Sequence, residues 1–203
     1  MNLSRVNLVR VPELHLMNRF AVRPLARGDI PHIIDYWVNA SPEHLLAMGA
    51  DVGKVPARAK WQANLEKILA TPEREATTFY LVWLVDGRPI GFNSLKNIKH
   101  GESGEMHLHL WEVSSRGKGY GGVLFCLAAI EFFRRFNLKT IVCEPSASNP
   151  APNRMLERIG FPLVVTYTAA TSELSLICEV NRYDIEQRVA EAYLTSLGLR
   201  DTR

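Results

Sequence analysis

The sequence predicts a single α/β domain in which helices flank a mixed, mainly antiparallel central sheet. Three observations lead to this fold class. Three β-rich runs follow one another between residues 79 and 113, a glycine-rich loop then leads into a long apolar helix, and a strand, a helix and two further strands follow. Such an order is typical of helices layered on a sheet. At 203 residues, the chain has room for one domain of ordinary size.

The N-terminal part predicts one strand and two helices. Residues 1–18 have no clear periodicity, and we treat them as an arm ahead of the domain. Alternating apolar residues from Phe20 onwards predict a short strand, and Asp29 is a suitable cap for the helix that follows. A turn-rich segment, residues 41–56, then leads to a second helix near residues 61–69.

The middle of the chain predicts three consecutive antiparallel strands. The dipeptide Asp86-Gly87 is a strong two-residue hairpin signal between the runs 79–85 and 90–95. In the third run, residues 105–113, apolar and polar side chains alternate, so they occupy opposite faces of the strand. The apolar face carries Met106, Leu108 and Leu110, and the other face carries Glu105, His107, His109 and Trp111.

The second half begins with a glycine-rich loop, residues 114–122, which leads into an apolar helix that Asn137 is suited to end. Residues 140–143 predict a short buried strand. Asn149, followed by proline, predicts the start of a helix that ends at Gly160. Two closing strands and a C-terminal helical tail are expected at residues 162–168, 174–180 and 183–203.

Composition and charge exclude several classes of function. A net charge of +3 with dispersed Lys and Arg residues argues against nucleic acid as a partner. The longest uncharged, mostly apolar run, residues 119–130, is shorter than the roughly 20 residues that a membrane-spanning helix needs. No cleavable signal pattern follows the N-terminus, so we expect a cytoplasmic protein. The sequence leaves a homodimer open.

The three cysteines predict neither a disulfide nor a zinc site. Cys126, Cys143 and Cys178 lack CxxC spacing, and each lies in an apolar segment. We therefore expect reduced packing residues.

The glycine-rich loop carries the main chemical signal. It places unobstructed backbone N–H groups at the positive end of a helix, an arrangement that binds phosphate. The simplest alternative is a turn that merely begins a helix. A second alternative is a dinucleotide site, since Gly117, Gly119 and Gly122 satisfy GxGxxG. That fingerprint belongs after the first strand of a parallel βαβ unit, whereas this loop follows a hairpin, so we disfavour it.

Two ordered motifs resemble the GNAT superfamily of N-acetyltransferases. The family signature R/Q-x-x-G-x-G/A is matched by Arg116, Gly119 and Gly121. Further along, residues 149–161 agree with the family pattern N-x-A-S-x-R-x-L-E-x-x-G-F, except that Pro152 replaces the serine. The resemblance covers roughly residues 19–182 and looks closest to bacterial ribosomal-protein and small-molecule acetyltransferases. It implies a GNAT-type sheet in that segment.

The resemblance also implies acetyl-CoA as the cosubstrate. Backbone N–H groups of residues 117–121 would hold the pyrophosphate, and the pantetheine arm would pair with the third consecutive strand at His109 and Trp111. The N–H group of His109 would then face the thioester oxygen, and Asn149 would contact the cosubstrate from the opposite wall. The full expected set is His109, Trp111, Val113, Arg116, Gly117, Lys118, Gly119, Tyr120, Gly121, Asn149 and Arg154.

Three polar residues on that strand are candidates for catalysis. Glu105 lies eleven residues before Arg116, the spacing at which histone-acetyltransferase-like members place a catalytic glutamate. The alternative is a solvated strand-end carboxylate, since many members use water relays instead. His107 and His109 share its face and are candidates for a base or a relay. A metal site is disfavoured because a third and fourth ligand with clear spacing are missing.

The position of a catalytic acid is changed in this sequence. Many members of the family place a tyrosine where this chain has Leu156. A thiol with a pKa of about 8.5 leaves tolerably as thiolate, so the acid is dispensable or supplied by water.

These observations predict an acyltransferase that moves an acetyl group from acetyl-CoA to a primary amine of a small molecule or protein N-terminus by direct attack. The alternative is a protein of the same fold that binds CoA without turnover, as a sensor or interaction module.

Overall fold

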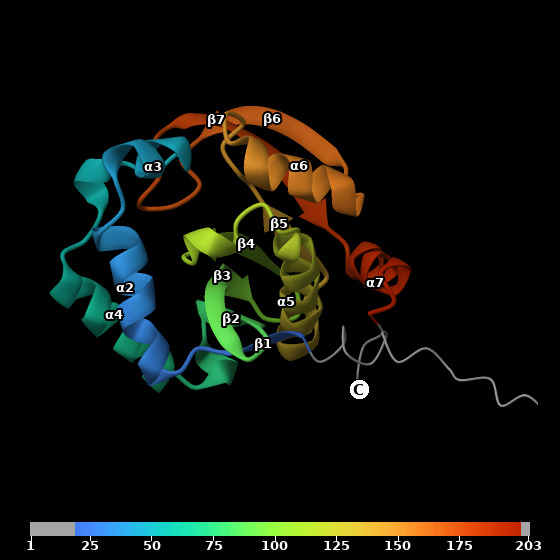
Figure 1. Cartoon of the computed structure of the whole chain (residues 1–203), viewed down its shortest axis with the longest axis horizontal. Coiled ribbons are helices and arrows are strands. Elements are labelled where there is room, and N and C mark those ends of the chain that lie inside the picture. Colours follow the sequence, from blue (N-terminus) through green and yellow to red (C-terminus); the bar gives the residue numbers. More distant parts are fainter. Residues whose placement is uncertain (1–18, 200–203) are drawn as a thin grey trace, which may run out of the picture.

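The computed structural model describes residues 19–199, so the expected arm, residues 1–18, lies outside the described residues. Helices flank a seven-stranded sheet of order β1-β2-β3-β4-β5-β7-β6, in which β4 and β5 are parallel and all other neighbours antiparallel (Figure 1). The predicted fold class is confirmed. The strands are β1 Phe20–Pro24, β2 Phe79–Val85, β3 Arg88–Lys99, β4 Ser103–Leu110, β5 Thr140–Cys143, β6 Leu163–Ala169 and β7 Cys178–Ile185.

The helices form two groups on opposite faces of the sheet. In Figure 1, α2 and α4 lie on one side of strands β1 to β4, and α5 lies on the other. Each group packs against its own cluster of buried side chains, which includes Phe92 for the α2 and α4 face and Phe125 for the α5 face. The helices are α2 Ile30–Val38, α3 Pro42–Ala47, α4 Arg58–Ala70, α5 Tyr120–Phe136, α6 Pro150–Ile159 and α7 Gln187–Ser196.

The turns that shape the sheet occur where the sequence predicts them. Asp86 and Gly87 join β2 to β3 with φ angles of 51° and 75°, the left-handed conformation that a tight hairpin requires. Asn137 ends α5 with a φ of 50°. Asp29 behaves differently from the expectation. Its carboxylate accepts hydrogen bonds from Arg23 and from the N–H group of Ala26 and does not cap α2.

The C-terminal segment differs most from the prediction. The last strand spans Cys178–Ile185 in place of residues 174–180, so Tyr183 is a buried strand residue and does not begin a helical tail. Helix α7 begins at Gln187 and buries Leu194 against the α5 cluster. The periodicity of a short amphipathic helix is easily confused with that of the strand before it. The tail is therefore part of the same core.

The parallel pair β4 and β5 is very short. Its register covers Ser103 to Glu105 on β4 and Thr140 to Val142 on β5, after which the two strands separate. The rest of β4 remains paired with β3 alone, through Gly91 opposite Leu110. One edge of β4 is thus left open toward the start of α5. Within residues 19–199, none of the helices is long and apolar enough to cross a bilayer.

Candidate active site

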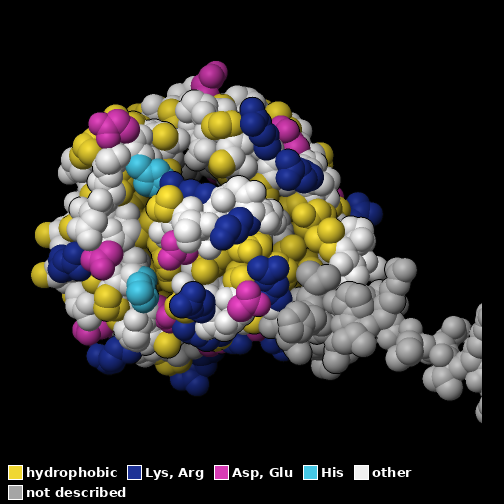
Figure 2. Space-filling model, in the orientation of Figure 1, with side chains coloured by type: hydrophobic (Ala, Val, Ile, Leu, Met, Phe, Trp, Pro, Cys, Tyr) yellow, Lys and Arg dark blue, Asp and Glu magenta, His cyan; other side chains and the backbone are white. Residues whose placement is uncertain are grey.

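A cavity of about 770 Å³ occupies the place where β4 and β5 separate. Its lining comes from both faces of the sheet: Tyr36 and Trp37 of α2 on one face, and the start of α5 with Met155 of α6 on the other. On the face drawn in Figure 2, the surface is hollowed between α3 and α6, and the basic side chains are scattered. The cavity therefore connects a helix N-terminus on one face with an aromatic chamber on the other.

The glycine loop forms one end of this cavity. Gly117 and Gly119 have φ angles of 73° and 79°, and a Cβ built on either would meet nothing within 4 Å. Both residues line the cavity, as do Tyr120 and Gly121, and Gly119 is the N-cap of the 17-residue helix α5. Left-handed glycines ahead of a helix expose the N–H groups of its first turn. This end is suited to bind a phosphate or diphosphate.

Basic side chains surround that end. Arg116 lines the cavity and reaches across it, with its guanidinium 3.4 Å from the carbonyl oxygen of Leu110 and 3.5 Å from His44 Nε2. Arg154 and Arg158, on α6, also line the cavity. Lys118 is exposed and lies outside the lining. Positive charge beside a helix N-terminus strengthens the preference for phosphate.

The open edge of β4 presents the backbone of Leu108 and Leu110. The carbonyl oxygen of Glu102 accepts from Thr140 on β5, and that of Leu110 faces the Arg116 guanidinium, so even-numbered residues point their N–H and C=O groups to the open side. The carbonyl oxygen of His109 instead lies against Gly91 of β3. Because backbone groups alternate along a strand, the N–H group of His109 faces β3 as well. This corrects the expectation that it faces a thioester in the gap.

His109 is enclosed by aromatic rings. Its ring stacks on Phe92 with a centroid distance of 4.7 Å and lies 5.0 Å from that of Trp37. The hydroxyl of Tyr36 is 3.3 Å from His109 Nδ1 and 2.8 Å from Met48 Sδ. Burial, with smaller contributions from neighbouring charges, lowers the pKa of His109 well below its usual range. The imidazole is therefore neutral at neutral pH.

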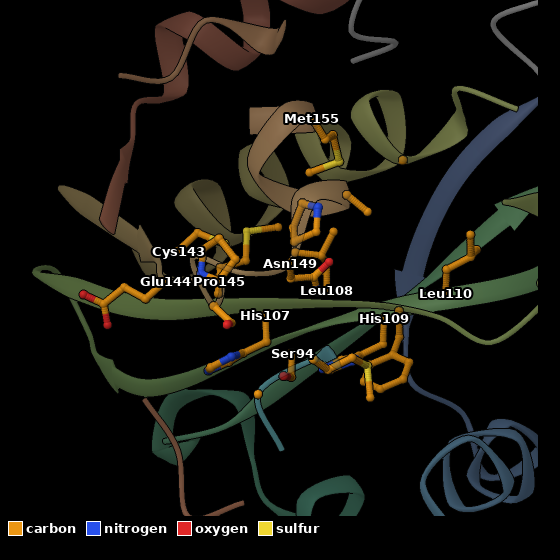
Figure 3. A pocket seen from close by; sticks show the side chains of 18 of the residues that line it. Ser94, His107, Leu108, His109, Leu110, Cys143, Glu144, Pro145, Asn149 and Met155 are labelled. Carbon is orange, nitrogen blue, oxygen red and sulfur yellow. The ribbon is translucent and has the colours of Figure 1, made fainter. Parts of the chain in front are cut away.

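His107 lies beside His109 on the same face of β4, across from Ser94 of β3. In Figure 3, Ser94 and His107 lie on one side of the strands, and Asn149 and Met155 lie on the other. Burial, with the charge of Lys96 as a second cause, lowers the pKa of His107 to about 3. Its Nε2 atom is buried and has no hydrogen-bond partner among the described residues. A neutral imidazole with a vacant nitrogen thus faces the aromatic chamber.

Three other predicted residues lie outside the lining. Glu105 is half-buried, and its carboxylate accepts a hydrogen bond of 2.9 Å from Asn97 Nδ2. Trp111 donates to the carbonyl oxygen of Pro89 at 3.3 Å and packs with the α2 cluster. Val113 is 64% exposed, beyond the end of β4. Asn149, in contrast, lines the cavity at the start of α6.

Several lining residues were not predicted from the sequence. Ser94 and Lys96 lie on the same face of β3 as Phe92, directly across from His107 and Glu105. Residues 92, 94 and 96 share one face of a strand, so their place in the site could be predicted from the sequence once β3 was paired with β4. Tyr36 and Trp37, on the first helix, are brought to the histidines by the tertiary structure alone.

The structure offers no side-chain acid at position 156, where many members of the family have a tyrosine. Leu156 is fully buried within the α5 cluster, and Pro152 lines the cavity without a proton to donate. Ser146 and Ser148, whose hydroxyls are 2.9 Å apart, lie near the start of α6, and Ser146 reaches the lining.

Metal-binding groups are not assembled in the described part of the chain. No cluster of three or more His, Cys, Asp or Glu side chains suitable for a metal ion occurs among residues 19–199. Cys126, Cys143 and Cys178 are free thiols. Burial raises the pKa of Cys126 and Cys143 to about 12, so these two thiols are protonated at neutral pH.

Comparisons with known proteins agree with this geometry. The family model described as acetyltransferase (GNAT) domain matches residues 19–162. Among solved structures, Mycobacterium smegmatis RimJ in complex with CoA-disulfide has a TM-score of 0.70 at 16% identity, covering 88% of this chain and 89% of its own.

Two further solved structures are similar to the chain. Spermidine N-acetyltransferase from Vibrio cholerae, in complex with CoA and spermine, has a TM-score of 0.67 at 18% identity, covering 85% and 98% of the two chains. The ribosomal-protein-S5-alanine acetyltransferase from Vibrio fischeri has a TM-score of 0.67 at 17% identity, covering 83% and 93%. No curated protein matches the sequence significantly.

Proposed function

The chain belongs to the GNAT acetyltransferase domain family, and from that premise we propose that it moves the acetyl group of acetyl-CoA to a primary amine by direct attack. The observation that carries the proposal is the cavity, which joins the N-terminus of α5, with its open glycine loop, on one face of the sheet to an aromatic, histidine-lined chamber on the other. The family and the CoA complexes of similar structures support acetyl-CoA as the cosubstrate. The amine is a small molecule or a protein N-terminus.

In this proposal the glycine loop binds the diphosphate of CoA. Open N–H groups at Gly117 and Gly119 meet the phosphate oxygens, and Arg116 and Arg154 add charge from two sides. Asn149 contacts the pantetheine arm from the α6 side. The arm pairs with the backbone of Leu108 and Leu110 in the place of a neighbouring strand, because β5 has diverged from β4 at this level.

The same open edge stabilises the negative charge that develops in the transition state. As the amine nitrogen attacks the carbonyl carbon, an N–C bond forms, negative charge develops on the oxygen, and the C–S bond then breaks to release the thiolate of CoA. An N–H group of Leu108 or Leu110 is a fixed donor directed at this oxygen, and such donors contribute roughly 100- to 1000-fold to rate.

The amine must lose a proton, since an alkylammonium with a pKa of about 10 has no free electron pair at neutral pH. We assign Glu105 as the final acceptor, reached through water and His107. On the same face of β4, His107 lies two residues nearer to the gap than Glu105. Its neutral imidazole can accept a proton at one nitrogen while it releases a proton from the other. His109 keeps the aromatic wall in place beside this route.

The competing function is a protein that binds CoA without turnover. It is favoured by Leu156, which leaves the departing thiol without a side-chain acid at the family position. Thioester consumption, followed with an aromatic thiol reagent across a panel of amines, separates the two. Amine-dependent release of CoA supports the transferase, and CoA binding without release by any amine supports the sensor.

Chelation is expected to leave turnover unchanged. The proposed reaction uses backbone N–H donors and proton transfer through side chains and water, so it needs no metal ion. Dialysis against EDTA followed by a rate measurement checks this, with metal analysis of the purified protein as the control. Stoichiometric zinc together with loss of activity on chelation would overturn the prediction.

A further inference from the structure

The chamber on the α2 side of the gap, which we call the acceptor chamber, is lined, among the described residues, by positive charge and by no carboxylate. It is lined by Tyr36, Trp37, Trp61, Phe92, Ser94, Lys96, His107 and His109. Its formal charges are the ammonium of Lys96 and, beside Tyr36, the guanidinium of Arg116. Among the described residues that line the whole cavity, the one carboxylate is Glu144, which accepts a 2.5 Å hydrogen bond from Tyr167. In Figure 3, Glu144 extends away from His107 and His109.

The ammonium of Lys96 has no close counterion. Burial lowers its pKa, while the carboxylates of Glu173 and Glu105 raise it from a distance. Within residues 19–199, no carboxylate lies within the 4.0 Å of an ion pair with Lys96, and Glu105 is held by Asn97. A partly buried cation without a close partner is unfavourable until an anion meets it.

Lys96 is also within electrostatic reach of the reaction centre. Its charge lowers the pKa of both His107 and His109. Lys96 lies two residues along β3 from Ser94, which faces His107, and two residues of strand span roughly 7 Å. The lysine side chain bridges a distance of that size. An anionic group near Lys96 and an amine near the gap therefore fit on one small molecule.

One side of the acceptor chamber is closed by two distant segments of the chain. The residues after α3 and the loop between β6 and β7 are joined by two backbone hydrogen bonds, from Asp51 to Leu174 and from Leu176 to Gly49, of 2.7 and 2.8 Å. Gly49, Leu174 and Leu176 all line the cavity. The contact between these two segments limits the room for a polypeptide chain and favours a compact acceptor.

We propose that the acceptor is a compact primary amine that carries both an aromatic body and a carboxylate, as in an aromatic amino acid, and that Lys96 binds the carboxylate. The proposal rests on the function proposed above and specifies its substrate class. The aromatic body packs against the parts of Trp37 and Trp61 that line the cavity, each of which is 8% exposed. A polyamine is disfavoured, because its additional ammonium groups would enter a chamber that already holds an uncompensated lysine.

The test compares two amines that differ by the carboxylate alone, phenylalanine and phenethylamine. With the wild-type chain, kcat/KM should be at least 10-fold higher for phenylalanine. Lys96→Gln should raise KM for phenylalanine by roughly 10- to 100-fold, the range expected for one charge-assisted hydrogen bond, and leave KM for phenethylamine nearly unchanged. Lys96→Arg should restore part of the difference. Lys99→Gln, at an exposed position of the same strand, is the matched control.

Each outcome bears on one proposal or both. Preference for spermidine or for a peptide N-terminus over phenylalanine overturns the acceptor class and leaves the transferase function standing. Equal effects of Lys96→Gln and Lys99→Gln also overturn it. Calorimetric titration of the CoA-bound protein with phenylalanine covers the remaining case: binding that Lys96→Gln abolishes, without acetylation, supports the acceptor site and contradicts turnover. Absence of both binding and acetylation overturns the acceptor class.

Discussion

Gly119→Asp is expected to raise the dissociation constant for CoA on the order of 1000-fold. The residue is the N-cap of α5 and lines the cavity, with open space where a side chain would begin. An aspartate there brings a negative charge beside the site proposed for the diphosphate. Two like charges about 4 Å apart near a protein surface repel by about 4 kcal/mol, which is roughly 1000-fold in affinity. Calorimetric titration with CoA measures the effect.

The hairpin glycine offers a matched control for this substitution. Gly87 has a φ of 75°, close to the 79° of Gly119, and is likewise open around its missing Cβ. Gly87→Asp therefore introduces a similar backbone strain and the same charge, at a turn that does not line the cavity. It should destabilise the fold comparably and bind CoA as the wild type does. Unchanged CoA affinity in folded Gly119→Asp contradicts the loop assignment.

The fold was predictable because its decisive signals are local. Asp86-Gly87 fixes a tight hairpin through its left-handed backbone, and Asn137 ends α5 in the same way. Alternation in residues 105–113 correctly separated Met106, which is buried, from the histidines that face the chamber. The closing strand was misplaced because Leu174 lies in a loop and packs on the α2 cluster, a tertiary role that periodicity does not reveal.

The candidate site was less predictable, because it depends on strand register and on contacts distant in sequence. Lys96 becomes a site residue only when β3 pairs with β4 so that positions 94 and 96 face 107 and 105. The direction of backbone groups is also set by register, since a shift of one residue exchanges His109 for Leu110 at the open edge. Tyr36 is 73 residues from His109 in the chain and meets it through the packing of α2 on the sheet.

Glu105→Gln is expected to lower kcat by roughly 100-fold or more while the CoA affinity and the KM for the amine change little. The substitution keeps the size of the side chain and its hydrogen bond with Asn97 but removes the site that finally receives the ammonium proton. Proton transfer by a positioned side chain contributes roughly 100- to 10,000-fold to rate. Glu105 lies outside the lining of the cavity, so its loss acts on the chemical step and not on binding.

The control for this prediction is Glu102→Gln, an exposed carboxylate in the turn just before β4. It removes the same charge close to the strand without touching the proposed route through His107, so its kcat should remain near that of the wild type. A separate fall in kcat for His107→Leu would support the relay, because a leucine of similar size passes no proton. If Glu105→Gln retains wild-type kcat while His107→Leu does not, the proton leaves from His107 directly to water, and Glu105 is a strand-end carboxylate held by Asn97.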